Sequence, residues 1–252
     1  MSSTNEVTVN NKAIIFAMAV EIILPFYFSL IWINHFKSKI MHGFYGVLGF
    51  ISSVTIESLI LSLIVTRFVD KKSLIFYLLA GSFPGIFEET GKFLFLKYLY
   101  NTEKEKNISI MYGIGHGGAE SIIAAFSLLT NLVSKEELIE KGILKESITS
   151  HICFMSIIER FFAIIIQISL SVFIYKSIKE KKIIYFLLAI IIHDGIDVFA
   201  LLQHIGYIKS ILLIELIVGI YALILSFYSC YLYNNIIDEK KEKSPENKQK
   251  LQ

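Results

Sequence analysis

Two adjacent carboxylates, Glu88 and Glu89, lie within a stretch that is otherwise apolar enough to cross a membrane, LIFYLLAGSFPGIFEETGKFLFLKYLY. Placing one ionised side chain at the centre of a bilayer costs about 2.5–3.5 kcal/mol on insertion scales. Because two ionised side chains carry this cost side by side, the pair indicates a chemical role rather than a role in packing. A carboxylate held in an apolar setting can act as a general base. Lys92 is four residues from Glu88, so we expect these two to pair on one helix face, with Glu89 turned aside.

Two histidines lie in similar apolar stretches, and each is followed four residues later by an acid. His116 precedes Glu120 in GIGHGGAE, and His193 precedes Asp197 in HDGID, which also holds Asp194. Side chains four residues apart share a helix face, so each carboxylate can orient its imidazole. Such groups are suited to proton transfer, to holding a reacting carbonyl or to binding a metal. The glycines beside His116 predict close approach by a helix or by a substrate backbone, and helix packing alone is the simpler alternative.

An acid and a base are neighbours at Glu159 and Arg160. Adjacent residues on a helix do not face each other, so we expect these two not to pair. Arg160 would then neutralise Glu88 or Glu89 from across a helix bundle. The sequence therefore predicts a catalytic set and a supporting set. The catalytic set is Glu88, Glu89, His116, His193 and Asp197, and the supporting set is Lys92, Glu120, Glu159, Arg160 and Asp194.

The elements that must position these residues are membrane-spanning helices. Of 252 residues, 54% are hydrophobic, and mean hydropathy is +0.62. Only 18% are charged, against about 25% in soluble domains. A spanning helix needs about 20 mainly apolar residues. The sequence predicts an all-α, polytopic membrane helical bundle with about seven transmembrane helices, eight being the alternative count. The predicted spans are 13–36, 44–66, 74–99, 109–133, 149–175, 183–203 and 210–233.

We expect one transmembrane domain, residues 1–237, with its motifs between about 70 and 215 and a charged, disordered tail at 238–252. Lysine and arginine are enriched in cytoplasmic loops. With seven spans, the loops and N-terminus on one side of the membrane hold eight lysines and arginines. The loops and tail on the other side hold fourteen, which predicts a cytoplasmic C-terminus. At about 1.5 Å per residue, Glu88, His116 and His193 lie roughly 16, 10 and 15 Å from that side, a depth similar enough for one site.

Three classes of function compete. Peptide-bond hydrolysis within or beside the membrane is the leading hypothesis. Buried carboxylates and histidines also serve proton relays, so a proton- or ion-coupled transporter is the second. A non-catalytic immunity or binding protein is the third. The net charge of +2 does not indicate a nucleic-acid partner, and Cys153 and Cys230 lack the spacing of a zinc site. Expected partners are membrane lipid and a membrane-associated or transmembrane peptide or protein substrate, in the bacterial cell membrane.

The motifs EETGK, HGGAE and HDGID resemble, in order and spacing, those of the PrsW-like intramembrane proteases. The glycine-rich histidine motif followed by the Glu-Arg pair is most similar to the YhfC-type branch. Both are related to the CAAX prenyl proteases and the wider Abi or CPBP group. The resemblance implies that Glu88 is the general base and that His116 is its partner on the water. It also implies that His193 and Asp197 orient the substrate or stabilise the oxyanion.

The resemblance leaves the role of a metal open. If the reaction depends on a metal, Glu88, His116, His193 and Asp197 would be the zinc ligands, a number that suits zinc. The chain lacks the H-E-x-x-H motif, and no thiol joins these residues. We therefore favour a glutamic mechanism without a cofactor, with zinc as the alternative.

Overall fold

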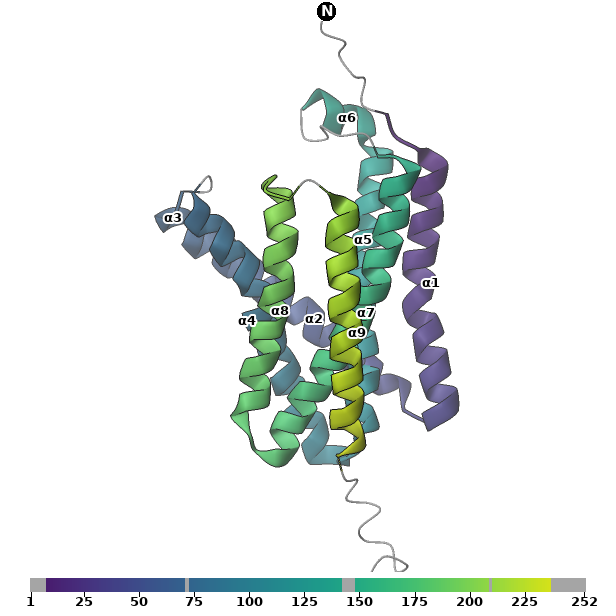
Figure 1. Ribbon diagram of the computed structural model, residues 1–252, viewed down its shortest axis with the longest axis vertical. Coiled ribbons are helices and arrows are strands. Elements are labelled where there is room, and N and C mark those ends of the chain that lie inside the picture. Colours follow the sequence, from purple (N-terminus) through teal and green to yellow (C-terminus); the bar gives the residue numbers. More distant parts are fainter. Residues whose placement is uncertain (1–7, 71–72, 142–147, 209, 237–252) are drawn as a thin grey trace, which may run out of the picture.

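The computed structural model describes residues 8–70, 73–141, 148–208 and 210–236, and these form an α-helical bundle (Figure 1). Its long helices correspond one for one to the predicted spans. They are α1 (Asn11–Phe36), α2 (Ile40–Ile60), α4 (Leu74–Glu103), α5 (Asn107–Val133), α7 (Ser150–Glu180), α8 (Ile183–His204) and α9 (Ile211–Asn234). A π-helical stretch, Leu61–Val65, joins α2 to the short α3 (Thr66–Phe68), and α6 (Lys135–Glu140) lies between α5 and α7. The predicted tail, 238–252, lies outside the described residues.

Five helical segments among the described residues are long and apolar enough to cross a membrane. They are α1, Ile40–Phe68, α7, Ile183–Leu202 and α9. Helices α4 and α5 are also long enough, with 30 and 27 residues, but they carry the glycines and charged side chains of the predicted site. The outer faces expose large apolar side chains such as Phe16, Ile23 and Leu30, as expected for contact with lipid. The protein is an integral membrane protein, and the all-α prediction is confirmed.

The two ends of the bundle are built differently. Helices α1, α4, α7 and α9 begin at the end where the described chain starts, and each is capped by a side chain that accepts an N–H of the first turn. The caps are Asn10, Ser73, Thr149 and Ser210. At the opposite end, α1, α4 and α7 each stop at a lysine in the left-handed conformation. These lysines are Lys37, Lys104 and Lys181. Figure 1 shows α1 beginning and α9 ending at opposite ends of the bundle.

Helix α5 packs against α1, α2 and α7, while α4 packs against α2, α7 and α8. Close packing around α5 depends on its glycines. A Cβ atom on Gly115 would lie 1.9 Å from the carbonyl oxygen of Gly43 in α2, and one on Gly113 would lie 2.5 Å from Cα of Ile168 in α7. No larger residue fits at these distances. The glycines beside His116 therefore serve helix packing, which brings the backbones of α2 and α7 close to α5 around the histidine.

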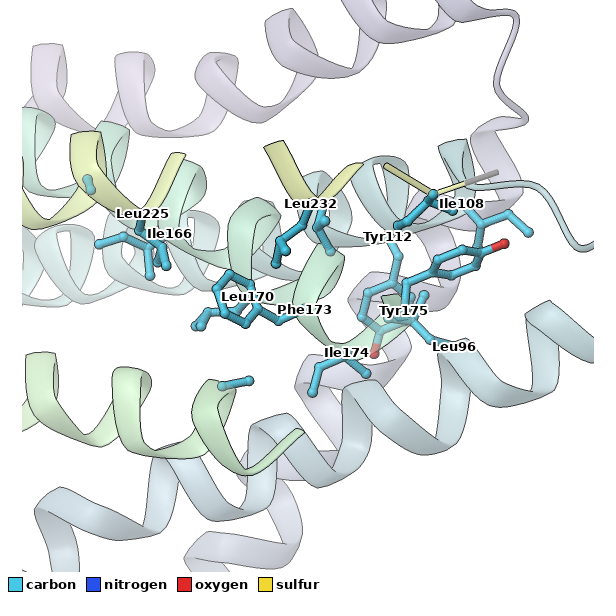
Figure 2. Packing of buried hydrophobic residues seen from close by; sticks show 14 of the residues in the cluster. Leu96, Ile108, Tyr112, Ile166, Leu170, Phe173, Ile174, Tyr175, Leu225 and Leu232 are labelled. Atoms are coloured by element: carbon cyan, nitrogen blue, oxygen red, sulfur yellow. The ribbon is translucent and has the colours of Figure 1, made fainter. Parts of the chain in front are cut away.

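A continuous apolar cluster joins α4, α5, α7 and α9 directly beside the predicted site residues (Figure 2). Leu96 lies one turn from Lys92 on α4, and Tyr112 lies one turn from His116 on α5. Leu170 belongs to the same cluster on α7. Because lipid tails are as apolar as these side chains, the cluster is stabilised by van der Waals packing between the helices. This cluster holds the helices that carry the polar residues in a defined register.

Candidate active site

Charged and polar side chains from α4, α5, α7 and α8 meet inside the bundle. Glu89, Lys92 and His116 are completely buried, and Glu88 and His193 are nearly so. Buried charges are stable only when they are paired or hydrogen-bonded. Contacts among these side chains supply partners, and they differ in part from the pairs expected from sequence spacing.

Glu88 faces both histidines. Its Oε2 atom lies 2.9 Å from Nε2 of His116 and 3.9 Å from Nε2 of His193. The imidazole of His116 is held by apolar neighbours, since its ring centroid lies 5.2 Å from that of Phe50 on α2 and 6.0 Å from that of Tyr112. The structure thus brings together three residues predicted to share a depth, and it places one carboxylate between two imidazoles.

Glu89 is the partner of Lys92, so the expected pairing of Lys92 with Glu88 is wrong. The ammonium group of Lys92 contacts Glu89 Oε1, and Nδ1 of His193 lies 2.7 Å from the same oxygen. Residues three and four positions apart both face each other on a helix, so spacing alone does not choose between the two glutamates. The choice follows from α7 and α8, which approach the face of α4 that carries Glu89 and Lys92.

Gln167 on α7 connects the two halves of the site, and the sequence interpretation missed it. Its Oε1 accepts a hydrogen bond from Lys92. Its Nε2 donates to Glu88 Oε2 at 3.3 Å and to Glu120 Oε2 at 3.0 Å. A lone amide in an apolar run, seven residues and thus two turns after Arg160, was the signal that would have revealed it.

Arg160 also has partners other than those expected. Its Nη1 donates to Glu120 Oε1 at 2.7 Å, and its Nη2 donates to the adjacent Glu159. It therefore does not neutralise Glu88 or Glu89 by direct contact, and the expectation that it would not pair with Glu159 is wrong. A guanidinium group carries several donors on a long, flexible stem, so it can bind two carboxylates even when one belongs to its neighbour.

The HDGID motif divides its acids between two tasks. Asp197 Oδ2 lies 3.6 Å from His193 Nε2, and it has no hydrogen-bond partner among the described residues. Asp194 lies against α4, where a Cβ on Gly85 would be 1.9 Å from its Oδ1. Asp197 thus stays beside the imidazole, whereas Asp194 is part of the contact between α4 and α8.

A polar cavity of about 120 Å³ opens next to these residues, between α5, α7, α8 and α9. Glu120, Arg160, Gln167, His193 and Asp197 line it. A water molecule occupies about 30 Å³ of liquid volume, so the cavity has room for several. Water admitted to this cavity would lie beside His193, Asp197 and Glu120.

Residues 20–218 match the model of a family described as "YhfC intramembrane metalloprotease". The chain belongs to this YhfC family. It is also 28% identical, over 157 residues, to "Uncharacterized membrane protein YhfC" of Bacillus subtilis (strain 168), a match that covers 55% of this chain and 61% of that protein. No solved structure matches significantly. The resemblance to the YhfC-type branch is confirmed, and the family match spans every predicted site residue.

The description of the YhfC family implies a metal, so the site can be tested for its fit. Imidazoles and carboxylates are zinc ligands, and Asp197 Oδ2 is a buried acceptor that lacks a hydrogen-bond donor among the described residues. Yet no group of three or more His, Cys, Asp or Glu side chains in the described ranges is placed to hold a metal ion. The donor types therefore fit zinc, whereas the arrangement seen pairs Glu88 with His116 and Glu89 with Lys92 and His193.

Proposed function

We propose that this protein is an intramembrane endopeptidase that hydrolyses a peptide bond in or beside the membrane with water activated by Glu88 and His116. The observation that carries the proposal is the position of Glu88 Oε2, 2.9 Å from His116 and 3.9 Å from His193, buried in the bundle beside a polar cavity. The family's description as a protease supports the same reaction class.

The proposed reaction uses Glu88 as a proton carrier. Glu88 takes a proton from a water molecule that His116 helps to orient, and the water oxygen attacks the peptide carbonyl carbon. The carbonyl oxygen gains negative charge, and His193, protonated on both ring nitrogens, donates to it from Nε2 while Nδ1 donates to Glu89. Glu88 then passes its proton to the amide nitrogen as the carbon–nitrogen bond breaks. The products are a carboxylic acid and an amine, so atoms and charge balance.

Glu89, Lys92 and Gln167 are the proposed positioning residues. Glu89 accepts from His193 Nδ1, which orients the imidazole and leaves Nε2 directed towards Glu88 and Asp197. Lys92 balances the charge of Glu89, and it also fixes which end of the Gln167 amide faces Glu88. Preorganised groups of this kind contribute to catalysis because they need not reorganise during the reaction.

We propose a glutamic mechanism, supported by the direct pairing of Glu88 with His116 and by the ammonium group of Lys92 within the cluster. Zinc is the second candidate, favoured by the family's description and by the donor types present. Glu88, His116, His193 and Asp197 would hold it. A zinc ion bound there would polarise the peptide carbonyl and lower the pKa of water.

The function can be tested by comparing bacterial membranes that contain the wild-type protein with membranes that contain Glu88→Gln. New protein termini found only with the wild type identify a substrate, which is then cleaved by purified protein in vesicles. We expect Glu88→Gln, His116→Ala and His193→Ala each to lose at least a hundredfold in kcat/KM. Glu137→Gln, the same change at an exposed position of α6, serves as the control. Full cleavage by all three variants contradicts the proposal, and solute uptake without cleavage supports a transporter.

We also propose that the C-terminal end of the bundle is cytoplasmic, which is supported by the lysines that end α1, α4 and α7 at that end. Single cysteines in a Cys153→Ala, Cys230→Ser background test this orientation. A maleimide that cannot cross membranes should label Glu136→Cys in intact cells, and it should label Lys181→Cys only after permeabilisation. The opposite labelling pattern contradicts the proposed orientation.

A further inference from the structure

We infer that a groove between α7 and α9 binds an apolar, membrane-embedded peptide segment, which reaches the active site from the lipid past Glu215. This inference rests on the proposed peptidase function, and it names the route of the substrate and the residue that receives it.

The groove has a volume of about 560 Å³ and is lined almost entirely by apolar side chains. Helix α7 contributes Ile158, Phe161 and Phe162, and α9 contributes Leu216, Ile220 and Leu223. A volume between 300 and 1,000 Å³ is typical of ligand sites, so several substrate side chains can fit here. Leu216, Ile220 and Leu223 are all more than half exposed, so the groove is open on the outer face of the bundle.

Among the described residues that line this groove, Glu215 is the single ionisable one. Its side chain is only 8% exposed, and its Oε2 atom has no hydrogen-bond partner within the described residues. An unsatisfied polar atom costs several kcal/mol in a membrane interior. A carboxylate accepts hydrogen bonds, so the missing partner is an N–H or O–H donor.

A peptide supplies such a donor, whereas a lipid acyl chain does not. A membrane-embedded helix must open before its backbone can be cut, and the opened turn exposes N–H groups that have lost their partners. Glu215 can accept one of these N–H groups where the segment leaves the groove. The unpartnered carboxylate therefore favours a peptide occupant over lipid.

Glu215 also lines the polar cavity, which continues to His193 and Asp197. The groove and the cavity thus share one residue, and a segment seated in the groove can direct its opened turn towards Glu88. Gly219 borders this passage on α9, where a Cβ would already lie 3.0 Å from the ring of Phe162. The route runs from lipid to groove, past Glu215, and into the catalytic cavity.

Binding can be tested in full-length Glu88→Gln protein, which keeps the groove and does not cut. The probe is a synthetic helix of about 20 leucine and alanine residues with a photoreactive group, placed in phosphatidylcholine vesicles. Leu223→Trp fills the groove, and Ile224→Trp is the control because Ile224 is 65% exposed and does not line it. We expect Leu223→Trp to reduce probe capture at least tenfold and Ile224→Trp to leave it within twofold. Equal capture by both variants overturns the inference.

Cleavage separates a failure of this route from a failure of the proposed function. With Glu88 intact, Leu223→Trp should cut the membrane-embedded substrate at least tenfold more slowly and still cut a short, water-soluble peptide with the same scissile sequence. Glu215→Leu should slow the embedded substrate in the same way, and Glu215→Gln, which keeps an acceptor oxygen, should restore most of the rate. If the wild type cuts neither substrate, the peptidase proposal fails. If Leu223→Trp cuts the embedded substrate at the wild-type rate, the route is wrong.

Discussion

Replacing Gln167 with methionine tests whether the alignment of Glu88 depends on α7. Methionine has a similar length but no amide, so the change removes the hydrogen bonds to Lys92, Glu88 and Glu120. None of the three charges loses its last partner. Glu88 keeps His116, Lys92 keeps Glu89, and Glu120 keeps Arg160. The variant should therefore fold, with a loss of about 1–3 kcal/mol in the free energy of unfolding.

The effect on catalysis follows from the bond to Glu88 alone. A hydrogen bond to a charged group contributes about 1.5–3 kcal/mol, and its length of 3.3 Å argues for the lower end of that range. If the bond orients the base mainly in the transition state, about 1.4 kcal/mol is lost there, which corresponds to a tenfold fall in kcat with little change in KM. Gln167→Glu should lose more, because it places a third carboxylate beside Glu88 and Glu120 and offers them no donor.

The assay is cleavage of the identified substrate in vesicles, at a temperature at which thermal melts show every variant folded. Ser171→Ala is the matched control, since Ser171 lies one turn further on α7 and its hydroxyl donates only to the backbone oxygen of Gln167. It should keep kcat within twofold of the wild type. A folded Gln167→Met protein with wild-type kcat would refute the claim that this amide positions the base.

Three other predictions concern the ion pair, the packing and the metal. Lys92→Met should destabilise the protein by about 1–3 kcal/mol, because it removes the ammonium partner of buried Glu89, which keeps its contact with His193 Nδ1. Thermal melting in detergent measures this loss, and a melting temperature equal to that of wild type contradicts it. Gly115→Ala should lower the free energy of unfolding by about 1–3 kcal/mol or more, since the added methyl group meets the carbonyl oxygen of Gly43. Gly195→Ala is the control and should be near neutral, because a Cβ there would lie 3.8 Å from the nearest atom, the hydroxyl oxygen of Tyr221. Dialysis against a chelator should leave kcat/KM within twofold, with less than about one zinc per ten chains by elemental analysis, because Glu88 pairs with His116 and His193 pairs with Glu89. Loss of activity that zinc restores would establish the metal mechanism instead.

The helices could be predicted from the sequence for a simple physical reason. Apolar runs of about 20 residues have few alternatives to a spanning helix, because a membrane offers no partners for free backbone groups. The cost of burying charge likewise singled out Glu88, Glu89, His116 and His193, since such residues are rare in apolar runs unless they have a task. Matching their depths was enough to expect that they meet, and the structure places them within 4 Å of one another through Glu88 and Glu89.

The partner of each charge was decided by the tertiary structure. Helical spacing allows Lys92 to reach Glu88 or Glu89, and the packing of α7 and α8 against α4 selects Glu89. Arg160 is long enough to reach several acids, and the position of α5 gives it Glu120. Gln167 carries no charge, so its role emerged only when α7 was seen to bring it between Glu88 and Glu120. The sequence by itself determined which helices carry costly side chains, because that cost depends on composition alone. The pairing of those side chains depends on distances between helices, which only packing sets.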